Sequence, residues 1–253
     1  MTDIIYGRHP VVAALRQPDS PLEEIMVAQG VKGAWLHEVK RLARAAGVRL
    51  RLQERAALDR VCGTPNHQGI AARRGSYVYR GLAELLDGLD SLAGPALLTA
   101  ADSLTDPMNL GNLCRSAFAA GAHGIIIPKD RAAGVTPVVI KAAAGALEYL
   151  PVYRVNNLAD CLGNLRDAGL AIIGTAADAP RSIYDTDLTQ PLVLVIGSED
   201  KGLRPRVRKQ CDLVASIPMA AREIGSLNAA TSGAVALFEA RRQRLMNLPP
   251  PVF

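Results

Sequence analysis

Residues 96–128 read ALLTAADSLTDPMNLGNLCRSAFAAGAHGIIIP, and this stretch decides the expected fold. Its two ends, ALLTAAD at 96–102 and HGIIIP at 123–128, are short apolar runs of the kind that form buried strands. The segment between them, LGNLCRSAFAAG at 110–121, has a helical pattern. A strand, a helix and a second apolar strand in this order predict a parallel sheet that helices cover on both faces.

The same alternation continues through the rest of the chain. Four further strands are predicted at 151–155, 170–176, 192–197 and 213–218. Helical patterns occupy 136–150, 157–169 and 203–210, and a long final helix ending in arginines is predicted at 226–245. This half of the chain is therefore expected to be a doubly wound α/β domain.

The first 75 residues repeat the alternation on a smaller scale. Strands are predicted at 23–28, 48–53 and 68–74, with helices at 9–17, 33–47 and 54–62. The next stretch has glycines and charges but no strong strand pattern, which suits a connector with a short helix. We expect a small α/β domain at 1–75, a linker at 76–95 and a larger domain at 96–253.

Composition narrows the class of protein. The 253 residues carry 29 Lys and Arg against 24 Asp and Glu, and this net charge of +5 favours a polyanionic partner. Aromatic residues make up only 4%, so aromatic stacking cannot be the main way of holding nucleic acid. The four cysteines lie far apart without a CxxC pair, so neither a metal site nor a disulfide framework is predicted. The N-terminus, MTDIIYGRHP, has neither a basic leader nor an apolar core, and we expect a soluble, cytoplasmic protein without a membrane span.

Three polar segments follow predicted strands of the larger domain, where open parallel sheets bind ligands. The first, 102–115, enters a helix near Asn109, where free backbone N–H groups favour anions, and ends at Arg115. The second is the tight loop GSEDKGL at 197–203, which is neither GxGxxG nor a phosphate loop. The third is Ile217-Pro-Met219, followed by Ser226-Leu-Asn228 at the start of the final helix.

Each segment has an ordinary structural interpretation when it is taken alone. Arg115 suits a surface or salt-bridge residue, the 197–203 loop suits a strand-to-helix turn, and Asn228 suits an N-cap. Their combination is more informative, because all three lie at the carboxyl ends of strands of one sheet. They are therefore expected on a single rim.

These segments resemble the SpoU/TrmH family of RNA 2′-O-ribose methyltransferases, within the SPOUT class. The resemblance is carried by DPMNLGNLCRSAFAAGAHGIIIPKDRA at 106–132, GSEDKGL at 197–203 and IPM…SLNAATSGAVALFEARRQR at 217–244, and it continues through 141–158 and 174–178. In the first part of the chain, YGRHPVVAAL at 6–15 and NHQGIAAR at 66–73 resemble an L30e-like substrate-binding domain. That domain is typical of the subgroup that methylates a guanosine in 23S ribosomal RNA, the RNA of the large subunit.

The resemblance implies S-adenosylmethionine as the cofactor and ribosomal RNA as the partner. It also implies a deep trefoil knot in the parallel-sheet domain, and a homodimer with its active site near the dimer interface. A tRNA 2′-O-methyltransferase of the same family and a non-catalytic ribosome- or RNA-binding homologue are the alternatives. The N-terminal domain argues against the first, and the intact set of motif residues argues against the second. A dinucleotide-dependent oxidoreductase is disfavoured because no GxGxxG follows the first strand.

The site roles also come from the resemblance. Arg115 activates the ribose hydroxyl, either as the proton acceptor or by lowering the hydroxyl pKa and binding phosphate, and both routes stay open because an arginine pKa lies above about 12. Asn109 is expected to orient Arg115 or the ribose, and Glu199 to shape the site through hydrogen bonds. Ser226 and Asn228 are expected to organise the cofactor loop and the ribose. The cofactor positions are Thr175, Gly197, Ile217, Met219 and Leu227, and no metal is expected.

Two further expectations concern the loops and the RNA. The loop Ala220–Gly225 is one residue longer than the family pattern, with Gly225 expected to serve as the usual glycine. Arginines within 71–74, 204–208 and 241–244 are candidates for RNA phosphate contacts, with ordinary solvated faces as the alternative. His67 is expected to make a structural hydrogen bond rather than to touch RNA.

Overall fold

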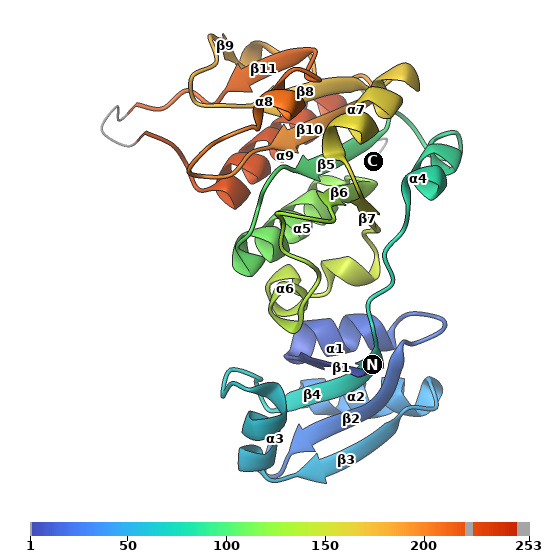
Figure 1. Cartoon of the computed structure of the whole chain (residues 1–253). Coiled ribbons are helices and arrows are strands. Elements are labelled where there is room, and N and C mark those ends of the chain that lie inside the picture. The colour runs from blue at the N-terminus through green and yellow to red at the C-terminus, as the bar shows by residue number, and fades with distance from the viewer. Residues whose placement is uncertain (1, 221–224, 247–253) are drawn as a thin grey trace. The chain divides into compact units, whose positions relative to one another are not determined.

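The computed structural model describes residues 2–220 and 225–246. By their contacts the residues form two compact units, whose elements are labelled in Figure 1. Unit 1 comprises Met1–Val78 together with Val135–Tyr149, and unit 2 comprises Tyr79–Gly134 and Leu150–Phe253. The sequence patterns did not predict that residues 135–149 pack with the first part of the chain. No helix within the described ranges is long and apolar enough to cross a membrane.

Unit 1 is built on a four-stranded sheet of order β1-β4-β2-β3. Its elements are β1 (Thr2–Tyr6), α1 (Arg8–Leu15), β2 (Leu22–Ala28), α2 (Ala34–Ala45), β3 (Arg49–Gln53), α3 (Arg55–Cys62), β4 (Ile70–Gly75), α6 (Pro137–Ala143) and the 3-10 turn η1 (Ala146–Glu148). Strands β2 and β3 are parallel, whereas β4 is antiparallel to both β1 and β2. The three predicted strands and three predicted helices of this region are confirmed, and β1 is an addition.

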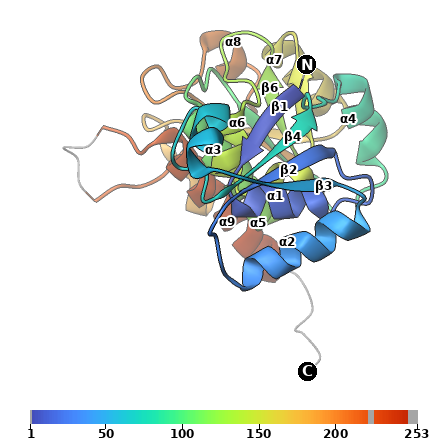
Figure 2. The same ribbon diagram turned by 90° about the horizontal axis from the view of Figure 1, so that it is seen from below.

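The helices of unit 1 pack against different parts of this sheet. Leu58 of α3 lies in a buried cluster with Tyr6, Met26 and Ala71. Helices α1 and α2 contact each other, and α2 also contacts the edge strand β3. In Figure 2, α2 runs along one side of the sheet. Its outward face is therefore available to solvent along most of its length.

The returning segment is fixed to unit 1 by packing and by one ion pair. Helix α6 contacts both α1 and β1. Gly145, at φ +97°, packs so closely that a Cβ there would lie 2.7 Å from the Cβ of Ala13. The guanidinium of Arg74 on β4 donates to Glu148 at 2.6 Å, and the two side chains are only 7% and 5% exposed. Such a pair is costly to break, because a lone buried charge has lost its hydration.

Unit 2 is a seven-stranded parallel sheet of order β7-β6-β5-β10-β8-β11-β9. Its strands are β5 (Leu97–Ala101), β6 (Gly124–Pro128), β7 (Val152–Val155), β8 (Ala171–Thr175), β9 (Arg181–Ser182), β10 (Leu192–Ile196) and β11 (Leu213–Ser216). Its helices are α4 (Leu82–Leu89), α5 (Pro107–Ala120), α7 (Leu158–Asp167), α8 (Pro205–Arg208) and α9 (Ala229–Met246), with the 3-10 turn η2 (Ile183–Asp185). The six predicted strands are confirmed, whereas β9 is an addition; the trefoil knot stays a prediction.

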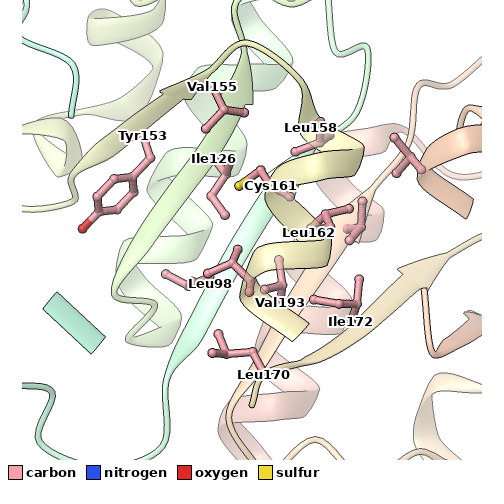
Figure 3. Close-up of a cluster of buried hydrophobic side chains, with 14 of the residues drawn as sticks. Leu98, Ile126, Tyr153, Val155, Leu158, Cys161, Leu162, Leu170, Ile172 and Val193 are labelled. Carbon is pink, nitrogen blue, oxygen red and sulfur yellow. The ribbon is translucent and has the colours of Figure 1, made fainter. Parts of the chain in front are cut away.

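Helices bury both faces of this sheet. On one face, Leu158, Cys161 and Leu162 of α7 point toward Leu98 of β5 and Val193 of β10 (Figure 3). On the other face α9 packs along α5 and contacts β10. Gly233 of α9 is required there, because a Cβ would lie 2.4 Å from the Leu113 side chain. Loops follow the carboxyl ends of β5, β8 and β10.

Two of the four cysteines are packed in the interior as small apolar residues. All four are free; Cys114 and Cys161 are buried, and burial raises the pKa of both thiols to about 12. They are therefore protonated and inert at neutral pH.

Candidate active site

A cavity of about 440 Å³ opens at the carboxyl edge of the unit 2 sheet. It is bounded by the ends of β8 and β10, by the segment after β11 and by the segment before α9. Its wall includes all five residues expected to bind the cofactor, namely Thr175, Gly197, Ile217, Met219 and Leu227. Glu199, Ser226 and Gly225 line it as well. Residues 221–224 of the longer loop lie outside the described residues.

The loop after β10 is held in one conformation by its two glycines. A Cβ on Gly197 would lie 2.4 Å from the carbonyl carbon of Gly202, so only glycine fits this approach. Gly202 takes φ +59°, and its N–H donates to the Ser198 carbonyl at 2.9 Å, while the Ser198 N–H donates back at 3.1 Å. This closed turn carries Glu199 at its tip.

A buried carboxylate anchors the far end of the same loop. Asp102 follows β5, is 0% exposed, and accepts hydrogen bonds from the Arg204 backbone N–H at 2.7 Å and from its Nε at 2.5 Å. Its own N–H donates to the Ile196 carbonyl at 2.8 Å. The ends of β5 and β10 and the start of α8 are therefore tied together behind the cavity.

Glu199 joins the three motif segments. Its Oε1 accepts from Asn109 Nδ2 at 2.8 Å, from Asn228 Nδ2 at 2.5 Å and from the Ala229 backbone N–H at 3.2 Å. Asn228 Nδ2 also donates to Asn109 Oδ1 at 2.9 Å. The expected single rim is thus a directly hydrogen-bonded cluster, whose members are 29 to 119 residues apart in the sequence.

We call Glu199, Asn109 and Asn228 the Glu199 cluster; helix N-termini place its two amides. Asp106 caps α5 by accepting from the Met108 N–H at 3.0 Å, and Asn109 follows in the first turn. Asn228 precedes α9, and its Oδ1 accepts from the Thr231 N–H at 3.2 Å, which leaves its Nδ2 for the cluster. One amide therefore acts both as an N-cap and as a member of the site. The Glu199 carboxylate lies at the N-terminus of α9, where the helix dipole favours negative charge.

Among the described residues, two of those expected to be catalytic, Arg115 and Ser226, make no hydrogen bond to the Glu199 cluster. Arg115 is exposed on α5, and its guanidinium makes no hydrogen bond or ion pair with any described residue. The side-chain amide of Asn109 is directed to Glu199 and Asn228 instead.

Most of the arginines suggested for RNA contact have structural partners. Arg74 is buried on Glu148, and Arg204 binds Asp102. Arg244 donates to the carbonyls of four residues, and burial lowers its pKa. The charges of these three arginines are used within the fold, which supports a structural role for them. The structural expectation for His67 is confirmed: it is fully buried, with Nε2 2.8 Å from Asp59 and Nδ1 accepting from the Gly69 N–H.

The sequence patterns did not place Asp178 or Arg208 in the cavity wall; Arg208 was expected only among the candidate arginines for RNA phosphate contact. Asp178 follows β8 and Arg208 ends α8; the two form an ion pair at 3.1 Å, and the hydrogen bond from Arg208 lowers the pKa of Asp178. The position of Asp178 just beyond a strand end was the available signal. The described residues include no group of three side chains that could hold a metal ion.

Comparisons with known proteins agree with this geometry. Residues 96–238 match the SpoU rRNA Methylase family, and residues 4–79 match the RNA 2′-O ribose methyltransferase substrate-binding domain. The chain is 40% identical to the 23S rRNA (guanosine-2′-O-)-methyltransferase RlmB of Nitrosomonas europaea, with 98% of this chain and 96% of that protein covered. It is 41% identical to RlmB of Shewanella oneidensis, with 96% and 98% covered.

A solved structure extends the comparison to three dimensions. The SpoU methyltransferase AviRb of Streptomyces viridochromogenes, determined in complex with AdoMet, has a TM-score of 0.78 at 29% identity. The match covers 97% of this chain and 92% of AviRb. On the family match, the relatives and the shared fold, this chain belongs to the SpoU rRNA methylase family.

Proposed function

We propose that this protein transfers the methyl group of S-adenosylmethionine to the ribose 2′-hydroxyl of a guanosine in 23S ribosomal RNA. The observation that carries the proposal is the Glu199 cluster, in which the carboxylate of Glu199, a residue of the cavity wall, binds the side-chain amides of Asn109 and Asn228. The names of the RlmB relatives support the substrate, because those proteins match the chain over almost its whole length. The substrate-binding domain at 4–79 supports it further.

The cavity suits this cofactor in size and chemistry. Its volume of about 440 Å³ lies in the range of small-molecule sites. Ile217, Met219 and Leu227 give it an apolar side, where an adenine gains from burial, and the 197–203 backbone offers polar groups. S-adenosylmethionine supplies an electrophilic methyl group on a positively charged sulfur. The carboxylates of Glu199 and Asp200 in the wall match that positive charge.

The remaining polar groups are suited to the ribose and its phosphate. Glu199 Oε1 uses one N–H of the Asn109 amide, which leaves the second N–H for a ribose oxygen. The Arg115 guanidinium is exposed and can bind RNA phosphate or the reacting hydroxyl. Ser226, in the cavity wall, offers a hydroxyl to the cofactor or the ribose. In either role, as proton acceptor or as the group that lowers the hydroxyl pKa, Arg115 needs the Glu199 cluster to fix the sugar.

The proposal includes a homodimer that acts in the cytoplasm on ribosomal RNA. Apolar surface on two contacting helices supports self-association: Phe118 of α5 is 44% exposed and Phe238 of α9 is 50% exposed. Light scattering on the purified protein tests this part, and a monomeric mass at micromolar concentration would contradict it.

Methyl transfer from labelled S-adenosylmethionine to unmodified 23S RNA tests the activity. We expect one 2′-O-methylguanosine in 23S RNA and no transfer to tRNA. Arg115→Ala should abolish transfer with unchanged thermal unfolding, whereas Arg166→Ala, an exposed arginine on α7, should leave the rate intact. Methylation of tRNA would overturn the substrate, and undiminished transfer by Arg115→Ala would overturn its role. Cofactor binding without transfer to either RNA would favour the non-catalytic homologue.

A further inference from the structure

The positive charge of the chain is concentrated in unit 1. That unit holds 13 Lys and Arg against 8 Asp and Glu, whereas unit 2 holds 16 of each. The whole net charge of +5 therefore belongs to unit 1. Since phosphate contacts dominate the affinity of proteins for nucleic acid, this imbalance directs the search for an RNA surface to unit 1.

Within unit 1, the exposed side of α2 gathers the charge. The face is formed by His37, Lys40, Arg41 and Arg44, which are all exposed and border one shallow depression of about 380 Å³ with Ala45. Their spacing of three, four and seven residues places them along one side of the helix. The opposite side holds the buried Val39 and Ala43. We call this set of four residues the α2 basic face.

No acidic group within the described residues neutralises this face. The side chains of Lys40, Arg41 and Arg44 make no ion pair or hydrogen bond with any described residue. The only acid of the helix, Glu38, is engaged by Arg16 at 2.6 Å. Elsewhere in unit 1, Arg73 and Arg74 both have carboxylate partners.

Like charges three and four residues apart destabilise a helix. Lys40 and Arg44, and Arg41 and Arg44, are two such pairs. A polyanion lying along the helix would relieve both repulsions at once. Stacking is not the means of binding, because the one tryptophan, Trp35, is half-buried with Arg8 4.5 Å from its ring centroid.

We infer that the α2 basic face binds the phosphate backbone of the substrate RNA, so that unit 1 holds the RNA by charge. This inference rests on the proposed function and assigns the RNA surface that the function requires. Contacts to phosphate position an RNA but do not read its sequence. The face should therefore contribute affinity to any RNA, and the choice of nucleotide should come from other residues.

The test compares two variants of the full-length protein that remove the same charge. Arg41→Gln/Arg44→Gln alters the α2 basic face. Arg55→Gln/Arg60→Gln alters two exposed arginines of α3, the helix that packs on Tyr6, Met26 and Ala71. RNA affinity is measured from 0.05 to 0.5 M KCl by fluorescence anisotropy, with a 23S RNA fragment and with an unrelated RNA of equal length. Cofactor affinity and the transfer rate at saturating RNA are measured in parallel.

We expect the α2 variant to lower the slope of log affinity against log salt by about 1.4 for single-stranded RNA, or by about 1.8 for a duplex if its phosphates behave like those of DNA. If the affinities converge near 1 M salt, a change of about 1.8 is roughly a 60-fold loss at 0.1 M. The loss should be equal for both RNAs, with unchanged cofactor binding and an unchanged rate at saturating RNA.

The outcomes separate this inference from the proposed function. Suppose that the wild type transfers methyl groups and that both variants keep the wild-type salt slope, or that the slope falls equally in both. The role of the α2 basic face in RNA binding is then refuted, whereas the proposed activity stands. A loss confined to the 23S fragment would also refute it, because phosphate contact cannot discriminate between RNAs. If the wild type neither binds nor methylates RNA, both proposals fall.

Discussion

Gly197→Ala tests whether the geometry of the loop after β10 governs catalysis. The added Cβ would lie 2.4 Å from the carbonyl carbon of Gly202, and 2.6 Å from its oxygen and from the Leu203 nitrogen. Carbon atoms in contact prefer about 3.5–4.0 Å, so the backbone must move by roughly 1 Å. The hydrogen bonds between Ser198 and Gly202, at 2.9 and 3.1 Å, cannot both survive that displacement.

The expected magnitude follows from what the loop carries. Forced overpacking costs about 1–3 kcal/mol. Each lost hydrogen bond adds about 1 kcal/mol. Because Glu199 lies between the two bonded residues, its carboxylate should shift away from Asn109 and Asn228. A misplacement of about 1 Å costs on the order of 100-fold in rate, so we expect transfer to fall by about that factor.

The assay measures kcat, KM for the cofactor and thermal unfolding. Gly163→Ala is the matched control, because it places the same methyl group inside α7, where the nearest atom is the flexible Gln210 Oε1 at 3.7 Å. Alanine should stabilise that helix by about 0.5–1 kcal/mol with no loss of rate. A Gly197→Ala enzyme within about threefold of wild type, less than 1 kcal/mol of barrier, would refute the reasoning.

Two further predictions concern stability. Glu148→Ala leaves the Arg74 charge buried without a partner and should lower the free energy of unfolding of unit 1 in urea by about 3–5 kcal/mol. The double variant Arg74→Met/Glu148→Leu should recover most of this loss. A loss below about 1 kcal/mol in Glu148→Ala would contradict the stabilising role of the ion pair. Burial, aided by the charge of Arg244, lowers the pKa of His123, whose Nδ1 accepts from the Leu97 N–H at 3.0 Å. As the pH falls, the unfolded chain therefore binds a proton at His123 before the folded protein does, and the free energy of unfolding should fall between about pH 7 and pH 5. His123→Asn should make this dependence of stability on pH less steep. An equal dependence in the variant and the wild type would contradict the role of His123.

The strands of unit 2 could be predicted from the sequence because they are buried on both faces of the sheet. Runs such as LVLVI at 192–196 have no polar side and are bounded by glycine or proline, so their ends fall within two residues of the prediction. The two-residue strand β9 is too short to carry a pattern. In unit 1, β1 was missed because TDIIY lies at the chain end without a preceding turn, and no residue pattern specifies that β4 runs antiparallel to its neighbours.

The sequence predicted where the candidate site lies in the sheet, but it did not predict the hydrogen bonds among its side chains. Asn109, Glu199 and Asn228 were expected on one rim because each follows the end of a strand of the same sheet. That a single oxygen of Glu199 holds both amides depends on loop geometry, which Gly197 and Asp102 set through long-range contacts. The structural role of Arg74 could not be predicted for a related reason: its partner, Glu148, lies 74 residues away in the sequence.

The division of unit 1 into two stretches of chain has a consequence for its biosynthesis. Domains generally fold as they emerge from the ribosome, N-terminal first, at about 5–20 residues per second. Val135–Tyr149 leaves the exit tunnel only after the sequence of two unit 2 strands, β5 and β6. Until then the N-terminal part of unit 1 is incomplete, and Arg74 lacks its counter-charge. A gene fragment that stops at residue 79 would encode that unfinished state permanently, whereas grafting 135–149 back onto it through a short linker should restore a self-sufficient RNA-binding module.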